Sequence, residues 1–283
     1  MEKIKIAGVP EHFNQPWKMA IDAGAFLSEE IDLEWTNVPE GTGKMCEMLR
    51  SGQADIAVIL TEGIVRDIVN GNPSRIVQEY VSSPLLWGIH VAEKSNYQTL
   101  SDLENKTVAI SRPGSGSQLM AYVNAKNQNW DTSSLKFEIV NTIDGAVDAL
   151  STGNADYFMW EHFMTKPLVD RAIFRRVADC PTPWPCFVIA ARNELIEKQD
   201  NTLKKVLQII NKQTNSFKSL PGISALLADE FHQKHADIEE WLKITTWSQS
   251  PLQESVLNNV QNQLLELSLI DKMGTFAEIA TAL

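Results

Sequence analysis

The chain has few cysteines, and their spacing excludes two common kinds of site. Only three of its 283 residues are cysteines, Cys46, Cys180 and Cys186, and an odd number cannot form a complete disulfide framework. The segment C-P-T-P-W-P-C (180–186) does not have the spacing of a zinc knuckle, and its three prolines favour a stiff extended loop. We therefore expect three buried, free thiols.

The chain also has few basic residues and no long apolar run. Its 25 lysines and arginines are outnumbered by 36 aspartates and glutamates, which gives a formal net charge of -11. A chain this acidic repels phosphate backbones and anionic lipids. No apolar run reaches the roughly 18 residues that a membrane-spanning helix needs. We expect neither a nucleic-acid partner nor membrane insertion.

Familiar catalytic and cofactor motifs are missing as well. The sequence contains no G-x-S-x-G and no H-E-x-x-H, and R-P-G-S-G-S (112–117) lacks the Gly-Lys-Ser/Thr ending of a phosphate-binding loop. His232 and His235 lie three apart, but no third ligand accompanies them. The sequence therefore predicts no metal site and no cofactor.

The first residues predict a strand. In M-E-K-I-K-I, Ile4 and Ile6 alternate with polar residues, whereas a secretory signal has a basic start and a long apolar stretch. We expect a cytoplasmic protein, or a periplasmic or otherwise extracytoplasmic one if a signal has been removed.

The first two thirds of the chain alternate short strands with helices, a rhythm typical of a largely parallel sheet with helices on both faces. Predicted strands are Lys3–Val9, Ile31–Asn37, Asp55–Leu60, Arg75–Val81, Lys106–Ser111, Lys136–Val140, Ala155–Trp160 and Phe187–Ala190. Predicted helices between them are Trp17–Ala25, Thr42–Ser51, Ile64–Val69, Ser117–Asn127 and Ile143–Thr152. Beyond Arg192 the spacing predicts only helices, at Glu194–Lys218, Ile223–His232, Ile238–Lys243 and Gln253–Leu267.

A short pattern recurs in the two halves of this rhythm. Leu49-x-x-Gly52-x-Ala54-Asp55 returns 101 residues later as Leu150-x-x-Gly153-x-Ala155-Asp156. Each copy is typical of a helix end, a glycine with positive φ and entry into a buried strand. The repeat predicts two related α/β lobes, each with a mixed, mostly parallel sheet flanked by helices, and a helical C-terminal tail. We expect residues 1–88 and 189–283 to form lobe 1 and residues 89–188 to form lobe 2, with two crossings that act as a hinge.

Several segments together resemble a known family. They are P-E-H-F-N-Q-P-W (10–17), A-I-D-A-G-A-F-L (20–27), E-E-I-D-L-E-W (29–35), G-T-G-K-M-C-E-M-L-R-S-G-Q-A-D-I-A-V (41–58) and L-S-D-L-E-N-K-T-V-A-I-S-R-P-G-S-G-S (100–117). In this order they resemble the type II solute-binding proteins of the sulfonate, nitrate, taurine and thiamine-precursor group. The resemblance covers about residues 1–190.

The resemblance implies the two-lobed type II periplasmic-binding-protein fold and capture of a small organic molecule between the lobes by hinge closure. The molecule would be anionic or similar to a thiamine precursor, and an ABC permease would be the partner of an extracytoplasmic protein. An alternative is a cytoplasmic enzyme on the same scaffold that acts on a thiamine- or pyrimidine-precursor-like metabolite, with Glu161, His162 and His12 as acid–base candidates. The fungal pyrimidine-precursor synthases of this group share a C-C-C-x-C motif that this chain lacks.

Candidate ligand-binding residues follow from the rule that ligands lie beyond the carboxyl ends of strands in open α/β sheets. The loop R-P-G-S-G-S (112–117) offers hydroxyls, a guanidinium and the free N–H groups of a helix start. Thr42 is expected to cap the helix that follows it. Three tryptophans could form aromatic walls, and glutamates and histidines could add charge. The predicted set is Glu11, His12, Asn14, Trp17, Thr42, Thr61, Glu62, Arg112, Ser115, Gly116, Ser117, Trp160, Glu161 and Trp184.

Overall fold

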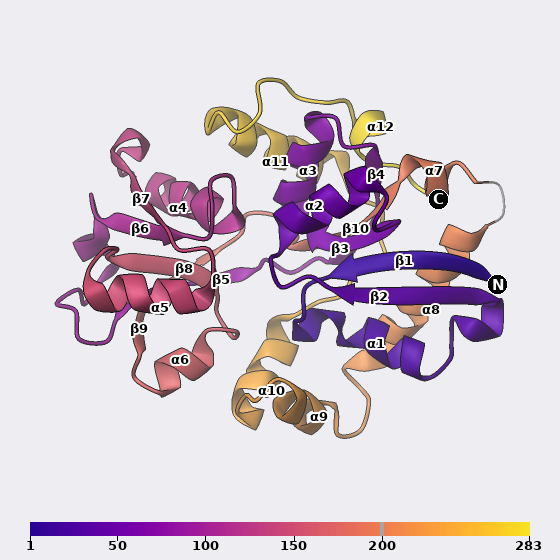
Figure 1. Ribbon diagram of the computed structural model, residues 1–283, viewed down its shortest axis with the longest axis horizontal. Helices are drawn as coiled ribbons and strands as arrows, with labels where there is room; N and C mark the ends of the chain where they lie inside the picture. The colour runs from indigo at the N-terminus through magenta and orange to yellow at the C-terminus, as the bar shows by residue number, and fades with distance from the viewer. Residues whose placement is uncertain (199–200) are drawn as a thin grey trace. The chain divides into compact units, whose positions relative to one another are not determined.

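The computed structural model describes residues 1–198 and 201–283 and divides into two compact units (Figure 1). Unit 1 comprises Met1–Ser83 and Trp184–Leu283, and unit 2 comprises Pro84–Pro183. The crossings lie a few residues before the expected ones. Strand β5 (Leu86–Ala92) consequently lies whole in unit 2, and β10 (Phe187–Arg192) lies whole in unit 1.

The sheet of unit 1 has five strands in the order β2-β1-β3-β10-β4. The strands other than β10 are β1 (Glu2–Gly8), β2 (Ile31–Asn37), β3 (Ile56–Leu60) and β4 (Ser74–Val81). β1 pairs in parallel with β2 and β3, whereas β10 is antiparallel to both of its neighbours. Strand β3, I-A-V-I-L, is almost wholly buried, as expected for a strand with helices on both faces.

The sheet of unit 2 repeats this arrangement in the order β7-β6-β8-β5-β9. Its other strands are β6 (Thr107–Ile110), β7 (Lys136–Ile139), β8 (Tyr157–Glu161) and β9 (Phe174–Pro181). β6 pairs in parallel with β7 and β8, and β5 is antiparallel to both of its neighbours. The prediction of two related, mostly parallel lobes is confirmed.

Helices cover both sheets. In unit 1 they are α1 (Gln15–Asp22), α2 (Thr42–Ser51), α3 (Thr61–Val69), α7 (Asn193–Ile196), α8 (Thr202–Phe217), α9 (Ile223–Glu230), α10 (His235–Ile244), α11 (Glu254–Glu266) and α12 (Phe276–Ile279). In unit 2 they are α4 (Gly116–Asn127), α5 (Ile143–Thr152) and α6 (Lys166–Asp170). Short 3₁₀ turns are η1 (His12–Asn14), η2 (Leu27–Glu29), η3 (Leu100–Leu103) and η4 (Thr132–Ser134).

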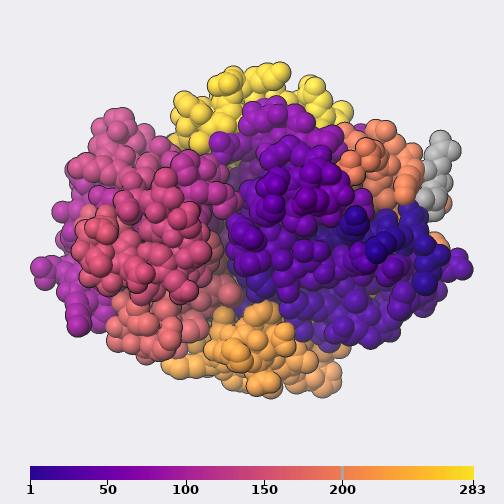
Figure 2. Space-filling model, viewed as in Figure 1, coloured from indigo at the N-terminus to yellow at the C-terminus, as the bar shows by residue number. Residues whose placement is uncertain are grey.

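The C-terminal third of the chain packs on the N-terminal strands and helices of unit 1. Helix α8 contacts α1, α11 contacts α3, and α12 contacts α3 and β4. Figure 2 shows the resulting surface of unit 1, in which indigo N-terminal atoms adjoin orange and yellow C-terminal ones. The expected helical tail is therefore present. Among the described residues, no helix is both long enough and apolar enough to cross a bilayer.

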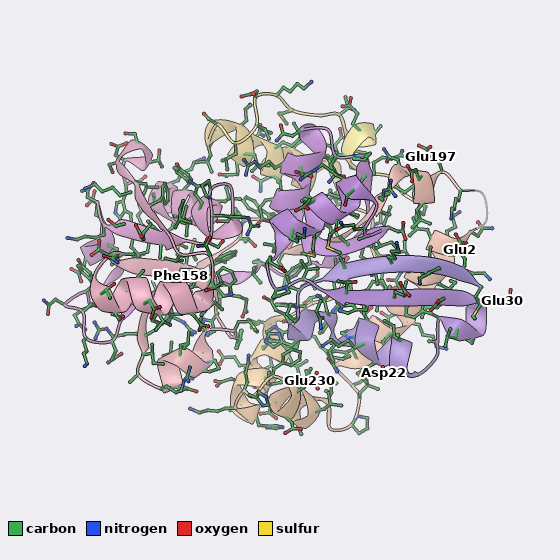
Figure 3. The ribbon with its side chains drawn as sticks, viewed as in Figure 1. Glu2, Asp22, Glu30, Phe158, Glu197 and Glu230 are labelled. Atoms are coloured by element: carbon green, nitrogen blue, oxygen red, sulfur yellow. The ribbon has the colours of Figure 1, made fainter. Side chains whose placement is uncertain are left out.

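Unit 2 has a hydrophobic core of its own. Phe158 of β8 (labelled in Figure 3) packs with Ala146, Ala149 and Leu150 of α5 and with Phe174 of β9. Several elements differ from the expectation: β5, α6 and α12 were not predicted, and two further differences have a clear reason. Strand β9 was not predicted, because the charged sequence F-R-R-V-A-D-C-P does not alternate. The helix expected over Glu194–Lys218 is α7 and α8 instead, and residues 199–200 of that range lie outside the described residues.

The recurring sequence pattern has the same structure in both units. Gly52 and Gly153 end α2 and α5 in the left-handed conformation, with φ of 72° and 77°. In each unit, the aspartate that follows then forms two hydrogen bonds with the neighbouring strand. The Asp55 N–H donates to the Lys5 carbonyl (2.8 Å) while its carboxylate accepts the Lys5 N–H (2.9 Å). Asp156 does the same with Thr107, at 2.8 Å for both bonds.

Candidate functional site

The carboxyl edge of the unit 1 sheet brings three predicted segments together. Gly8 of β1 lies beside Val58 of β3, so the segments that follow these two strands begin at the same edge. Helix α2 begins beside α3, because a Cβ at Gly63 would lie 2.2 Å from the Thr42 methyl carbon. This edge therefore collects Glu11, His12 and Asn14 after β1, Thr42 at α2, and Thr61 and Glu62 at α3.

Asn14 and Gln15, in the segment that follows β1, have buried acceptor atoms. The Asn14 side chain is fully buried, and its Nδ2 donates to the Val9 carbonyl at 2.9 Å. This bond orients the amide, and its Oδ1 accepts no hydrogen bond from the described residues. The Oε1 of Gln15 is likewise buried without a donor. Buried polar atoms are nearly always hydrogen-bonded, so these two oxygens need donors from elsewhere.

Glu62 carries the third such oxygen. Its Oε2 accepts the indole N–H of Trp184 at 2.8 Å, whereas Oε1 has no partner among the described residues. The side chain is only 2% exposed, and this burial raises its pKa to about 7. Thr61 also connects the start of α3 to the segment before β10, since its hydroxyl donates to the Pro185 carbonyl at 2.6 Å. Trp184 thus orients Glu62, and its ring is itself buried.

Glu11 is a second acid at this edge. Its side chain is partly buried, and burial raises its pKa to about 7. Near neutral pH the carboxyls of Glu11 and Glu62 are thus divided between charged and neutral forms.

His12 and Trp17 lie in the core of unit 1. The His12 ring is 4.2 Å from that of Trp241 and also contacts Phe13 and Phe231. Both of its nitrogens lack partners among the described residues, and burial lowers its pKa to about 3, so it is a poor base. Trp17 is 0% exposed and stacks on Phe26.

Thr42 does not cap its helix, contrary to expectation. Helix α2 already includes Thr42, and Gly41 is its N-cap, with φ of 77°. A positive φ at this position favours glycine. The Thr42 side chain instead packs on Gly63, which leaves no room there for any larger residue.

In unit 2 the loop before α4 is tied together by its own serines. Ser115 is the N-cap of α4, and its hydroxyl accepts the Gln118 N–H at 3.4 Å. The Ser117 hydroxyl lies 3.0 Å from that of Ser115 and accepts the Ser111 N–H at 3.0 Å. Both hydroxyls are buried in bonds of the loop, so the expectation that they are offered to a ligand gains no support.

The backbone N–H groups of this loop are better placed than its hydroxyls to bind an anionic group. The N–H groups of Gly116 and Ser117, in the first turn of α4, donate to no described residue. Arg112 is partly exposed, and its carbonyl accepts the Ser115 N–H. A helix start of this kind attracts anionic groups.

Trp160 and Glu161 end strand β8. The Trp160 ring stacks on Phe158, with centroids 5.4 Å apart, and meets Trp87 edge to face at 6.2 Å. It is partly exposed, whereas Glu161 is buried with its Oε2 accepting the Met164 N–H at 2.6 Å. Trp160 therefore keeps some surface for a planar group, and Glu161 stabilises the turn after β8.

A polar cluster in unit 2 was missed by sequence reasoning. His162 lies between Asp179, 2.8 Å from its Nδ1, and Arg176, 2.5 Å from its Nε2. Because arginine only donates, His162 must carry its proton on Nδ1 and donate it to Asp179. Arg176 also donates to the Nε2 of the buried His90 at 3.3 Å. The signal was hidden because Arg176 and Asp179 belong to the unpredicted strand β9.

The acid–base candidates of the enzyme alternative are divided between the two units, and this alternative stays a prediction. Glu161 bonds to the turn after β8, and His162 is held between two charged groups. His12 belongs to the other unit. Over residues 1–198 and 201–283, no three His, Cys, Asp or Glu side chains form a metal-binding group. The three cysteines are buried and form no disulfide, as expected.

Comparison with known proteins agrees with this architecture. The family described as Ca3427-like PBP matches residues 87–180, which are almost the whole of unit 2. The structure of the Candida albicans CA3427 gene product is similar over 97% of this chain and 92% of that one, with a TM-score of 0.87 and 24% sequence identity. It is described as having the generic periplasmic binding protein fold. No curated protein matches the chain.

Two sulfonate-binding proteins are also similar in structure. One is the alkanesulfonate-binding protein SsuA of Xanthomonas axonopodis pv. citri, bound to MOPS, with a TM-score of 0.84 and 15% sequence identity. The similarity covers 100% of this chain and 99% of that one. The periplasmic aliphatic sulphonate-binding protein SsuA of Escherichia coli has a TM-score of 0.76 and 19% identity, and all of this chain covers 94% of it. The chain therefore has the type II periplasmic-binding-protein fold, and its residues 87–180 match the Ca3427-like family of such proteins.

Proposed function

We propose that this chain binds a small organic molecule reversibly, with the carboxyl edge of the unit 1 sheet as one of its binding surfaces. The observation that carries the proposal is the set of three buried acceptor oxygens in the segments that follow β1 and β3, Asn14 Oδ1, Gln15 Oε1 and Glu62 Oε1. Each of them loses hydrogen-bonding free energy until a donor reaches it. A ligand that donates N–H or O–H groups supplies what these oxygens lack.

The fold supports the same proposal. Proteins similar in structure to this chain bind alkanesulfonates, and open α/β sheets bind ligands beyond their carboxyl ends. The acceptor oxygens add a requirement that a simple alkanesulfonate does not meet, because its sulfonate group only accepts. We therefore expect ligands that carry an amine, an amide or an aminopyrimidine group. Closure of two lobes on the ligand stays a prediction, which small-angle scattering with and without ligand would measure.

Isothermal titration calorimetry with matched pairs of compounds tests this function. The pairs are taurine with ethanesulfonate, β-alanine with propionate, and an aminopyrimidine with the unsubstituted pyrimidine. In each pair that binds, the member with an amino group should bind about tenfold or more tightly, since each charge-assisted hydrogen bond adds about 1.5–3 kcal/mol. If no compound bound, or if the members without an amino group bound equally well, the proposal would fail.

A pair of variants connects the result to the edge of unit 1. Glu62→Gln keeps an acceptor for Trp184 but removes the charge, and it should weaken binding of the amino compounds. Glu104→Gln, at an exposed glutamate of unit 2, is the matched control and should leave binding unchanged. Equal affinity of Glu62→Gln and the wild type would place the ligand elsewhere.

A further inference from the structure

Unit 2 contains a pocket that lies away from the candidate site. It has a volume of about 410 Å³ and is lined by residues 92 and 94–97 from the segment after β5, and by residues 150–153, 155 and 156 from the end of α5 and the start of β8. Asp156 immediately precedes β8, whereas Glu161 ends that strand. The pocket therefore opens at the edge of the sheet opposite to Trp160 and Glu161.

The two related sheets differ in sequence at this pocket. In unit 1, Ala190 of β10 pairs with Ala57, and in unit 2, His90 of β5 pairs with Phe158 at the same place in the pattern. Two residues further along each strand, Arg192 of unit 1 corresponds to Ala92 of unit 2. The pocket thus opens where the sister unit has an arginine side chain.

The guanidinium of Arg192 lies over the end of α2. Its Nη1 is 2.9 Å from the position that a Cβ on Gly52 would take, and its Nη2 pairs with Glu194 at 3.0 Å. A cation at a helix C-terminus is stabilised by the helix dipole. At the corresponding Gly153, which ends α5 with nearly the same φ, no atom of the described residues lies within 4 Å of the Cβ position.

The end of α5 in unit 2 offers a cation the same kind of environment as the end of α2 in unit 1. The carbonyls of Ser151 and Thr152, in its last turn, accept no backbone hydrogen bond from the described residues. Asp156 adds a carboxylate that is fixed by the Tyr97 hydroxyl at 2.7 Å. Ala92, Leu150 and Ala155 provide an apolar floor on which a flat group can lie.

From this correspondence we propose that the pocket is a second small-molecule site, which takes a ligand with a planar guanidinium or amidinium group. The ligand places its cation over the end of α5, as Arg192 does over α2. Lys94 also lines the pocket, but its side chain is exposed and its ammonium can stay in water. Neutral planar molecules gain only the apolar contacts and bind more weakly.

Benzamidine and its neutral counterpart benzamide test the proposal on the full chain. Amide NMR spectra should show that benzamidine shifts the signals of residues 92–97 and 150–156, and that benzamide binds at least about tenfold more weakly. Equal binding of the two compounds, or benzamidine shifts confined to other residues, would overturn the proposal.

Two variants exchange the side chains between the units. Ala92→Arg supplies the cation within the chain, so it should raise Tm and abolish the benzamidine shifts in unit 2. Arg192→Ala should lower Tm and create a new set of benzamidine shifts around Gly52. If Arg192→Ala created no site, or if Ala92→Arg folded but still bound benzamidine as the wild type does, the correspondence would not explain the pocket.

Discussion

At the scale of single residues, the carboxyl edge of unit 1 combines burial with incomplete hydrogen bonding. Glu62 accepts a hydrogen bond from Trp184 and is almost wholly surrounded by protein. A buried carboxyl is less costly when neutral, which is why burial raises its pKa to about 7. A donor from a ligand would favour the charged form, so ligand binding and proton release at Glu62 should be coupled.

Glu62 should also make stability depend on pH. The unfolded chain releases this proton near pH 4.5, whereas the folded chain keeps it until about pH 7. Its stabilising contribution is therefore full below pH 4.5 and is lost as the pH rises to 7. Over this range the unfolding free energy of the wild type should fall by about 3 kcal/mol relative to Glu62→Gln. Urea unfolding of both proteins from pH 4.5 to 8 measures the difference, and parallel curves would contradict the assignment.

The strand-end rule selected the segments of the site but not the direction of each side chain. Asn14, Thr61 and Glu62 were predicted and do lie together at one edge. His12 and Trp17 belong to the same segment but point into the core, because a 3₁₀ turn and a helix follow β1 there. Sequence spacing does not reveal which side of such a turn faces inward.

At the scale of elements, the turn that joins a helix to a buried strand is built the same way in both units. The glycine ends the helix, and the carboxylate of the aspartate then accepts a backbone N–H of the neighbouring strand. The helix end, the glycine and the start of the strand depend on local spacing and could be predicted from the sequence. The aspartate bonds join residues 50 and 49 positions apart and were not predicted. Strand β9 could not be predicted either, since its place in the sheet depends on pairing with the distant strand β5.

Removal of either carboxylate should destabilise the protein. Asp55→Ala leaves the Lys5 N–H without its acceptor, and Asp156→Ala does the same to the Thr107 N–H. We expect each change to lower the unfolding free energy by about 1–3 kcal/mol. Asp55→Asn and Asp156→Asn keep an acceptor oxygen and should cost less. Chemical unfolding measures these values, with Asp148→Ala on the exposed side of α5 as the control. An equal loss of unfolding free energy in the control would show that these hydrogen bonds contribute nothing to stability.

At the scale of the whole molecule, the two units share one sheet topology but differ in what surrounds it. The C-terminal helices α8, α11 and α12 pack on unit 1, while unit 2 is a single continuous segment with its own core. The repeated motif predicted the shared topology. The differences, such as Arg192 against Ala92, become visible only when the strands are aligned by their register.

The central claim is that the buried oxygens at the carboxyl edge of unit 1 receive their hydrogen bonds from a ligand. A crystal structure of the full chain with the tightest-binding amino compound tests it most directly. The account predicts a donor atom of that compound within about 3.2 Å of Asn14 Oδ1, Gln15 Oε1 or Glu62 Oε1. A compound bound elsewhere, with these three oxygens bonded only to protein or ordered water, would contradict it.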